Sequence, residues 1–113
     1  LFIGMQRYCL TLDLKDDEIL IKEYEAHHEA VWPEVLESIH RIGVVHMKIY
    51  RVNIRLFMII EVDETFDFLK METMTLNNSK VSDWEQIMDN YQQRLPFAKS
   101  GEKWVLMNKI FDL

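Results

Sequence analysis

A tyrosine and a histidine capable of proton transfer lie four residues apart in the segment Tyr24-Glu25-Ala26-His27-His28. Four residues make about one helical turn, so on a helix Tyr24 and His28 would share a face. An imidazole can accept and release a proton near neutral pH, and a neighbouring phenol can hydrogen-bond a polar substrate. The pair therefore indicates an acid/base site. The alternative is a buried histidine hydrogen-bonded to a carbonyl group.

The residues around this pair repeat at steps of three and four, the spacing of one helical face. The series is Ile21, Tyr24, His28, Val31, Val35, Ile39 and Ile42. It predicts a helix over residues 16–41 with this face turned inward and with Gly43 as its stop. Because proline has no N–H to donate, Pro33 predicts a kink or a break into two helices.

Adjacent histidines suggest a metal site, but helix geometry argues against one. His27 and His28 would diverge by about 100° around a helix, so they cannot readily hold one ion. Glu23 with His27, and Glu25 with Glu29, have a suitable spacing, but we expect both pairs on the outward face. The chain also lacks a Gly-x-Ser-x-Gly elbow and a glycine-rich phosphate loop. The chemistry that the sequence still allows is acid/base catalysis without a metal, with the ligand bound by aromatic side chains.

Composition and charge exclude several classes of partner. The chain has 113 residues, of which 49% are hydrophobic and 28% charged, as in an ordinary globular domain. A formal net charge of -6 argues against nucleic acid and anionic membranes as partners. No segment approaches the roughly 20 apolar residues of a membrane-spanning helix. A neutral small molecule fits this balance better than a phosphorylated one.

The single cysteine, Cys9, and the absence of a signal pattern at the N-terminus predict a cytoplasmic protein. We expect the domain to span residues 5–113, with residues 1–4 as an artificial remnant or an extension ahead of Met5.

The remaining segments predict an α+β fold. The expected strands are 7–14, 44–51, 55–63 and 104–111, the expected helices are 66–74 and 82–93, and 76–79 is an expected loop. The short connection at 52–54 predicts an antiparallel hairpin. This order is the ferredoxin-like split βαβ pattern, a four-stranded antiparallel sheet with helices on one face.

The face of the sheet that lacks helices would be too apolar to lie open to water. It would carry Cys9, Thr11, Tyr50, Phe57 and Ile59. A second copy of the chain would cover it, so we expect a homodimer joined sheet to sheet, as in a dimeric α/β-barrel.

The segment from Glu23 to Glu34 resembles the L-rhamnose mutarotase family, with its pattern Tyr-x3-His-x3-Trp-Pro-Glu. The likeness extends from Met5 to Leu113. It includes the hairpin segment Phe57-Met58-Ile59-Ile60-Glu61-Val62, the helix with Trp84 and Met88, and the terminal Ile110-Phe111. The resemblance implies a cytoplasmic, ferredoxin-like homodimer that uses no cofactor. It also implies that His28 is the catalytic proton donor and that Tyr24 is a substrate-binding phenol.

Two positions depart from the family pattern. A sugar-contacting tyrosine of the family is Met47 here, and a Trp-Trp pair is Trp84 followed by Glu85. The first change removes a hydroxyl group, and the second replaces a stacking ring by a carboxylate that can accept hydrogen bonds from sugar hydroxyls. We expect Trp84 to expose an indole that can stack on a sugar, while Trp32 is expected to be a core anchor.

These observations predict a mutarotase that exchanges the α and β anomers of a 6-deoxyhexose monosaccharide, L-rhamnose first and L-fucose second. The pocket residues would be His28 as the catalytic group and Tyr24, Met47, Trp84 and Glu85 as substrate contacts. One alternative is a cofactor-free monooxygenase of the dimeric α/β-barrel type, which would consume oxygen. Another is a non-catalytic sugar-binding module, which would not exchange the anomer signals of a sugar in saturation-transfer NMR.

Overall fold

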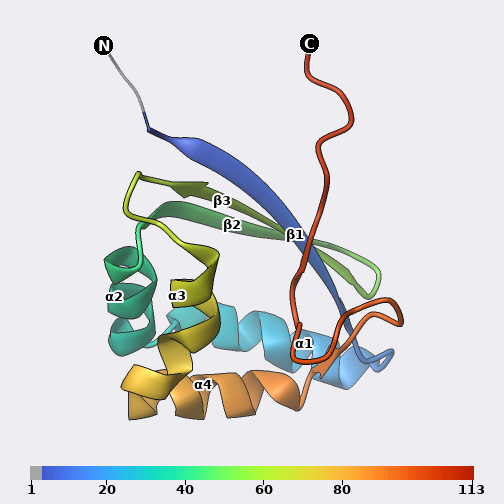
Figure 1. The fold of residues 1–113 in the computed structure, drawn as a ribbon. Helices are drawn as coiled ribbons and strands as arrows, with labels where there is room; N and C mark the ends of the chain where they lie inside the picture. The colour runs from blue at the N-terminus through green and yellow to red at the C-terminus, as the bar shows by residue number, and fades with distance from the viewer. Residues whose placement is uncertain (1–3) are drawn as a thin grey trace.

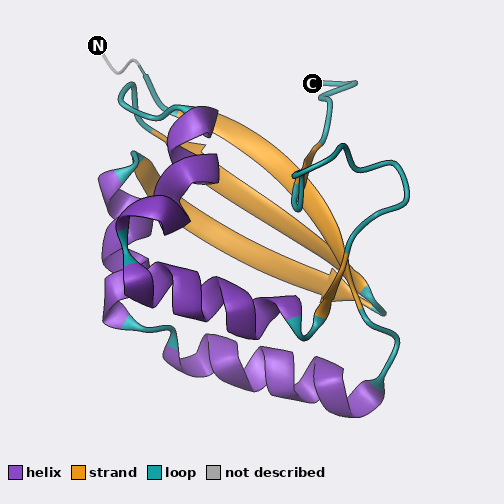
Figure 2. Ribbon diagram, turned by 60° about the horizontal axis from the view of Figure 1, so that its bottom comes forward, coloured by secondary structure: helices purple, strands orange, loops and turns teal. Residues whose placement is uncertain are grey.

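The computed structural model describes residues 4–113, in which an antiparallel sheet carries the helices on one of its faces (Figures 1 and 2). The elements in chain order are β1 (Gln6–Leu14), α1 (Glu18–His27), the 3-10 helix η1 (His28–Ala30), α2 (Pro33–Arg41), β2 (Val44–Val52), β3 (Arg55–Val62), α3 (Phe68–Thr73), the 3-10 helix η2 (Met74–Asn77), α4 (Ser79–Asp89), β4 (Gln92–Gln93) and β5 (Val105–Leu106). The strand order is β2-β3-β1-β4, and β5 also pairs with β1. The predicted split βαβ architecture is therefore confirmed.

The three long strands follow the predicted alternation of side chains. β1 pairs with β3 so that Leu12 lies opposite Leu56, and β3 pairs with β2 through a tight hairpin. Asn53 in that hairpin has a φ of 53°, a left-handed conformation that asparagine tolerates better than most residues. The buried leucines of β1 face the helices, so this side of the sheet forms the floor of the core.

The predicted long helix breaks at Pro33, as expected. Asp17 caps α1, since its side chain accepts hydrogen bonds from the backbone N–H groups of Ile19 and Leu20. The helix ends at His27, and after a 3-10 turn Pro33 occupies the first position of α2. His28 therefore lies at the C-terminal end of α1, where the chain turns toward α2.

Gly43 ends α2 as predicted. Its φ is 101°, and a Cβ atom at this position would lie 2.7 Å from the backbone nitrogen of Phe66. Only glycine fits this turn, because both the conformation and the space exclude a side chain.

The predictions for the C-terminal half are partly wrong. The expected helix at 82–93 runs from Ser79 to Asp89. It begins early because Asn78 caps it by accepting hydrogen bonds from the backbone N–H groups of Lys80 and Val81. Part of the expected loop at 76–79 continues the 3-10 helix η2, and residues 92–93 form the short strand β4. The expected strand at 104–111 pairs with β1 only at 105–106, followed by a hydrogen bond from Met107 N–H to Cys9 O.

Two clusters of buried side chains lie between the sheet and the helices. The first contains Leu14, Tyr24, Val35, Leu56, Val81, Trp84, Met88 and Tyr91. The second contains Leu10, Val44, Met58, Ile60 and Val62. Ile39, Ile49 and Trp104 are partly buried and pack against both clusters. Among residues 4–113, no helix is both long enough and apolar enough to cross a membrane.

Candidate active site

The predicted pair Tyr24 and His28 is in contact in the structure. Their ring centroids are 4.5 Å apart, and Tyr24 is 3% exposed while His28 is half-buried. His28 Nδ1 lies 2.8 Å from the backbone oxygen of Tyr24. Because a carbonyl oxygen can only accept, Nδ1 carries the proton in the neutral ring, which leaves Nε2 as the basic nitrogen.

The basic nitrogen of His28 has no hydrogen-bond partner in the described part of the protein. Nε2 makes no hydrogen bond to the residues that the structure describes, and it is not among their fully buried polar atoms. The carbonyl-bonded histidine considered as an alternative is therefore present, but only through Nδ1. The same hydrogen bond fixes the ring and leaves the other nitrogen free to exchange a proton.

Trp84 is not the exposed indole that the sequence suggested. It is 5% exposed and packs within the first cluster, with its ring 5.7 Å from His28 and 5.4 Å from Trp32. The reason is that α4 begins three residues earlier than expected, so Trp84 lies within the helix and not at its start, on the side where α4 contacts α2 and where the Trp84 ring meets His27 at the end of α1. Trp32 packs against the same cluster, in agreement with its expected core role.

His27 was predicted to lie on the outward face of the helix, and the structure places it half-buried beside Tyr91. Its Nε2 lies 3.2 Å from the hydroxyl of Tyr91, which donates a hydrogen bond of 3.2 Å to Glu23. Since the Tyr91 proton goes to Glu23, its oxygen accepts from His27, and Nε2 carries the His27 proton. A depression of about 300 Å³ lies beside these residues, lined also by Ala26 and Ala30.

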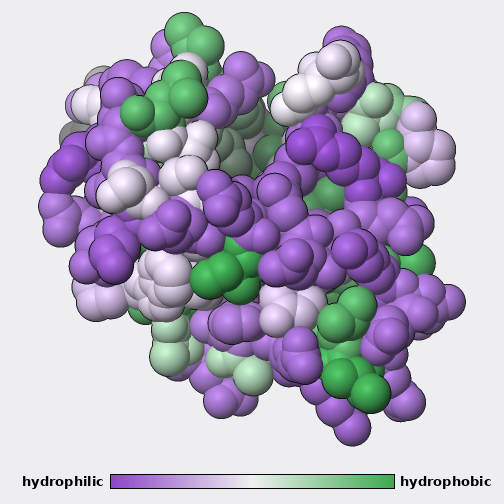
Figure 3. All heavy atoms as spheres, turned by 90° about the horizontal axis from the view of Figure 1, so that it is seen from below, coloured by the Kyte–Doolittle hydropathy of each residue, from purple (hydrophilic) through white to green (hydrophobic). Residues whose placement is uncertain are grey.

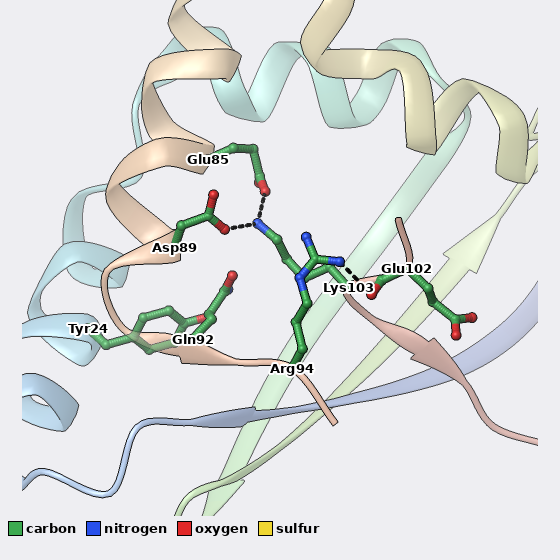
Figure 4. A network of polar contacts seen from close by, with 7 residues as sticks. All are labelled: Tyr24, Glu85, Asp89, Gln92, Arg94, Glu102 and Lys103. Atoms are coloured by element: carbon green, nitrogen blue, oxygen red, sulfur yellow. Dashed lines mark hydrogen bonds and ion pairs between the residues drawn. The ribbon is translucent and has the colours of Figure 1, made fainter. Parts of the chain in front are cut away.

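The hydroxyl group of Tyr24 lies in a second polar network (Figure 4). It accepts a hydrogen bond of 3.2 Å from Gln92 Nε2. Burial raises the pKa of Tyr24 to about 12, the Gln92 hydrogen bond opposes this shift, and the negative charge of Glu85 adds to it. The phenol is therefore neutral at physiological pH and acts as a hydrogen-bonding group.

Glu85 lies in this network and is bound by a lysine that the sequence reasoning missed. Lys103 Nζ is 2.7 Å from Glu85 and 2.6 Å from Asp89, and its side chain is 17% exposed. Burial lowers the pKa of Lys103, but the hydrogen bonds and charges of Asp89 and Glu85 outweigh burial and raise it. The spacing of Glu85 and Asp89 on one helical face was a usable signal, whereas Lys103 approaches from a distant segment.

Met47 lies apart from the other predicted residues. It extends from β2 toward the helices and packs against the second cluster, whereas Tyr24 and Trp84 belong to the first. Trp104 joins the two regions by packing against both. Tyr8, Met47 and Ile49 are only half-buried although they lie on the helix side of the sheet. This inner face is therefore incompletely covered, and the helix side of the surface is hollowed near the upper edge of Figure 3, with hydrophobic atoms in its depth.

Comparisons with known proteins identify the family. A family model described as L-rhamnose mutarotase matches residues 7–113. An L-fucose mutarotase of Xanthomonas campestris pv. campestris is 37% identical over 113 residues, which covers 98% of this chain and 90% of that protein. A UPF0734 protein of Dictyostelium discoideum is 36% identical, over 94% of this chain and 88% of its own length.

The fold is also similar to a solved structure. The crystal structure of an L-rhamnose mutarotase from Formosa agariphila matches with a TM-score of 0.70 and 20% identity, over 96% of this chain and 98% of that one. The model match covers nearly the whole chain, and two relatives exceed 35% identity over most of their length. The chain therefore belongs to the L-rhamnose mutarotase family.

Proposed function

We propose that the protein interconverts the α and β anomers of a 6-deoxyhexose, with His28 as the group that exchanges the proton. The observation that carries this proposal is the half-buried imidazole whose Nδ1 is bound to a carbonyl and whose Nε2 is free beside Tyr24. L-rhamnose and L-fucose are the two candidate substrates. The 37% identical relative is named an L-fucose mutarotase, which supports testing both sugars side by side.

The proposed step balances without a redox change. His28 Nε2 takes the proton of the anomeric hydroxyl while a water molecule gives a proton to the ring oxygen, so the C1–O5 bond breaks and a C1 aldehyde forms. In ring closure the protonated His28 is the proton donor. Rotation about C1–C2 and the reverse proton transfers close the ring on the other face. General acid/base help of this kind contributes typically about 10² to 10⁴ in rate.

The other proposed contacts follow from the chemistry of each side chain. The neutral phenol of Tyr24 can donate a hydrogen bond to a sugar oxygen, and Glu85 can accept one from a hydroxyl. Met47, half-buried on the inner face of the sheet, offers an apolar contact for the C6 methyl group of a 6-deoxy sugar. Trp84 would hold His28 in place with its buried ring and would not contact the sugar through an exposed face.

Exchange NMR on equilibrated sugars tests the proposal, with two adjacent histidines as a matched pair. L-rhamnose, L-fucose, D-galactose and D-glucose are each mixed with the wild-type protein, with His28→Asn and with His27→Asn. We expect the exchange rate of the preferred 6-deoxyhexose to fall about 10²- to 10⁴-fold in His28→Asn. His27→Asn should stay within about threefold of wild type. Loss of activity only in His27→Asn would move the reaction to the Tyr91 side of α1, and saturation transfer without anomer exchange in the wild type would make the protein a sugar binder.

We also propose that two copies associate through the uncovered face of the sheet, in the cytoplasm. Tyr50 is exposed there and Phe57 and Ile59 are half-buried. The C-terminal segment extends beyond the sheet on the side opposite the helices (Figure 1), and its Ile110 and Phe111 are 95% and 75% exposed. Apolar side chains this exposed are typical of a surface that another chain covers.

Light scattering on the full chain tests the association. We expect a dimer for the wild type and a monomer for Phe57→Asp, because a buried unpaired carboxylate opposes association. Leu76→Asp, a charge introduced at an exposed leucine of η2 on the helix side, is the matched control and should remain dimeric. A dimer that survives Phe57→Asp would contradict this interface.

A further inference from the structure

The network around Lys103 has hydrogen-bonding capacity that the protein itself does not use. An ammonium group has three N–H donors, and two of those of Lys103 are taken by Glu85 and Asp89. Gln92 Oε1 is buried and has no partner. The hydroxyl of Tyr24 accepts from Gln92, and its own proton has no acceptor among residues 4–113.

The unsatisfied amide is informative because such groups are costly. A buried polar atom without a partner costs about 1–3 kcal/mol, so native proteins rarely keep one without a reason. Turning the amide over does not remove the problem. One of its two polar atoms faces the Tyr24 hydroxyl, and the other remains without a partner in either orientation.

The three free groups match one class of ligand. Lys103 and Tyr24 each offer a donor and Gln92 offers an acceptor, and a sugar hydroxyl can donate and accept at once. The carboxylates of Glu85 and Asp89 repel an anion, while the ammonium of Lys103 repels a cation. A neutral polyhydroxy compound is therefore the ligand that this charge pattern admits.

The network is continuous with the proposed catalytic group. Tyr24 contacts the His28 ring at 4.5 Å on one side and Gln92 on the other, and the charge of Glu85 reaches the Tyr24 phenol. Figure 4 shows Lys103 entering between Glu85 and Asp89 from the segment that precedes β5. A ligand held at His28 and Tyr24 would thus extend toward Lys103.

We propose that Lys103, together with Gln92, determines the sugar specificity of this protein by hydrogen-bonding the hydroxyl groups away from C1. This inference rests on the proposed function. L-rhamnose and L-fucose differ in configuration at C2 and C4, so donors fixed in one place can reach the hydroxyl of one epimer and miss that of the other. Because these hydroxyls do not react, Lys103 acts on binding in the ground state and the transition state alike.

The first test is Lys103→Met, which keeps the aliphatic stem and removes the ammonium group. For the preferred sugar we expect KM to rise about 10- to 100-fold, the usual worth of a hydrogen bond to a charged group, with kcat within about threefold. The preference for L-rhamnose over L-fucose, or the reverse, should fall by about tenfold or more. Lys22→Met removes the same charge from an exposed position on α1 and should change none of these values.

The second variant, Gln92→Leu, separates binding from folding. Leucine fills a similar volume without the unsatisfied atom, so we expect the midpoint of thermal unfolding to stay within a few degrees of wild type while KM rises. A purely structural role for Gln92 would lower the midpoint and leave KM unchanged, and that result would contradict the proposal.

Saturation-transfer binding measurements distinguish the two levels of failure. If the wild type exchanges anomers and His28→Asn does not, but Lys103→Met keeps the same KM and the same epimer preference, only the role of Lys103 is overturned. If the wild type binds neither L-rhamnose nor L-fucose, both proposals fail. If it binds them without exchanging the anomers, the proposed reaction fails, and a weaker, less selective binding by Lys103→Met would still support the specificity role.

Discussion

Two adjacent histidines, one at the end of α1 and one at the start of η1, lie in similar aromatic surroundings, but they differ in how their polar groups are satisfied. The outer cluster, Glu23, His27 and Tyr91, is a chain of hydrogen bonds that ends on a carboxylate. The inner cluster, Tyr24, His28 and Gln92, leaves a basic nitrogen, a hydroxyl proton and a buried amide oxygen unused. Both histidines pack against the Trp84 ring.

The difference shows that proximity to aromatic rings does not by itself identify a reactive histidine. A one-residue step rotates the side chain by about 100° around the helix, which here separates a self-satisfied network from an unsatisfied one. Free hydrogen-bonding capacity is what a ligand can use, so the inner cluster is the better candidate. The following variants separate the two clusters, from the largest expected effect to the smallest.

Trp84→Ala should lower the free energy of unfolding most, by about 3–5 kcal/mol, because it leaves a cavity beneath both histidines. Urea denaturation monitored by circular dichroism measures the loss. Trp32→Ala, at a half-buried ring on the edge of the same cluster, should cost less and serves as the comparison. Equal losses in the two variants would mean that the Trp84 indole is not the common support of the two clusters.

Tyr24→Phe should flatten the alkaline limb of the stability curve. The pKa of Tyr24 is raised to about 12 in the folded protein from an ordinary value near 10. The folded state therefore holds this proton more tightly, and its contribution is complete below pH 10 and is lost as the pH rises toward 12, by up to roughly 2–3 kcal/mol. Urea midpoints measured between pH 9 and 12 check this, and identical slopes in wild type and Tyr24→Phe would refute it.

Tyr91→Phe should break the outer cluster with a smaller effect. Removing the hydroxyl deletes its bonds to His27 and Glu23, for which we expect about 1 kcal/mol of lost stability. Anomer exchange should remain within about threefold of wild type, since nothing in the inner cluster changes. A loss of exchange comparable to that of His28→Asn would assign a catalytic role to the outer cluster.

Glu23→Gln should have the smallest effect. The amide oxygen can still accept the hydrogen bond from Tyr91, and the position is exposed, so the change in unfolding free energy should stay within about 0.5 kcal/mol. Thermal unfolding of the variant beside Tyr91→Phe measures the difference. A Glu23→Gln effect larger than that of Tyr91→Phe would mean that the charge, rather than the hydrogen bond, holds the outer cluster together.

Local signals in the sequence predicted the first two thirds of the fold closely. Alternation gave β1 to β3, the helical stripe gave α1 and α2, and Pro33 and Gly43 gave their boundaries, because these signals act within a few residues. The C-terminal segment was predicted less well. The length of its pairing with β1 depends on the path of the loop at 94–104. A run of apolar residues indicates a possible strand but does not determine that path.

For the candidate site, the sequence by itself determined the Tyr24–His28 pair, because two residues one turn apart on a helix must meet wherever the helix lies. Only the tertiary structure decided that Trp84 is buried, that His27 is bound to Tyr91 and that Lys103 joins Glu85. These contacts link residues 18 to 64 positions apart in the chain, or depend on which helix covers which. Such contacts are fixed by the packing of whole elements, and spacing within one element carries no information about them.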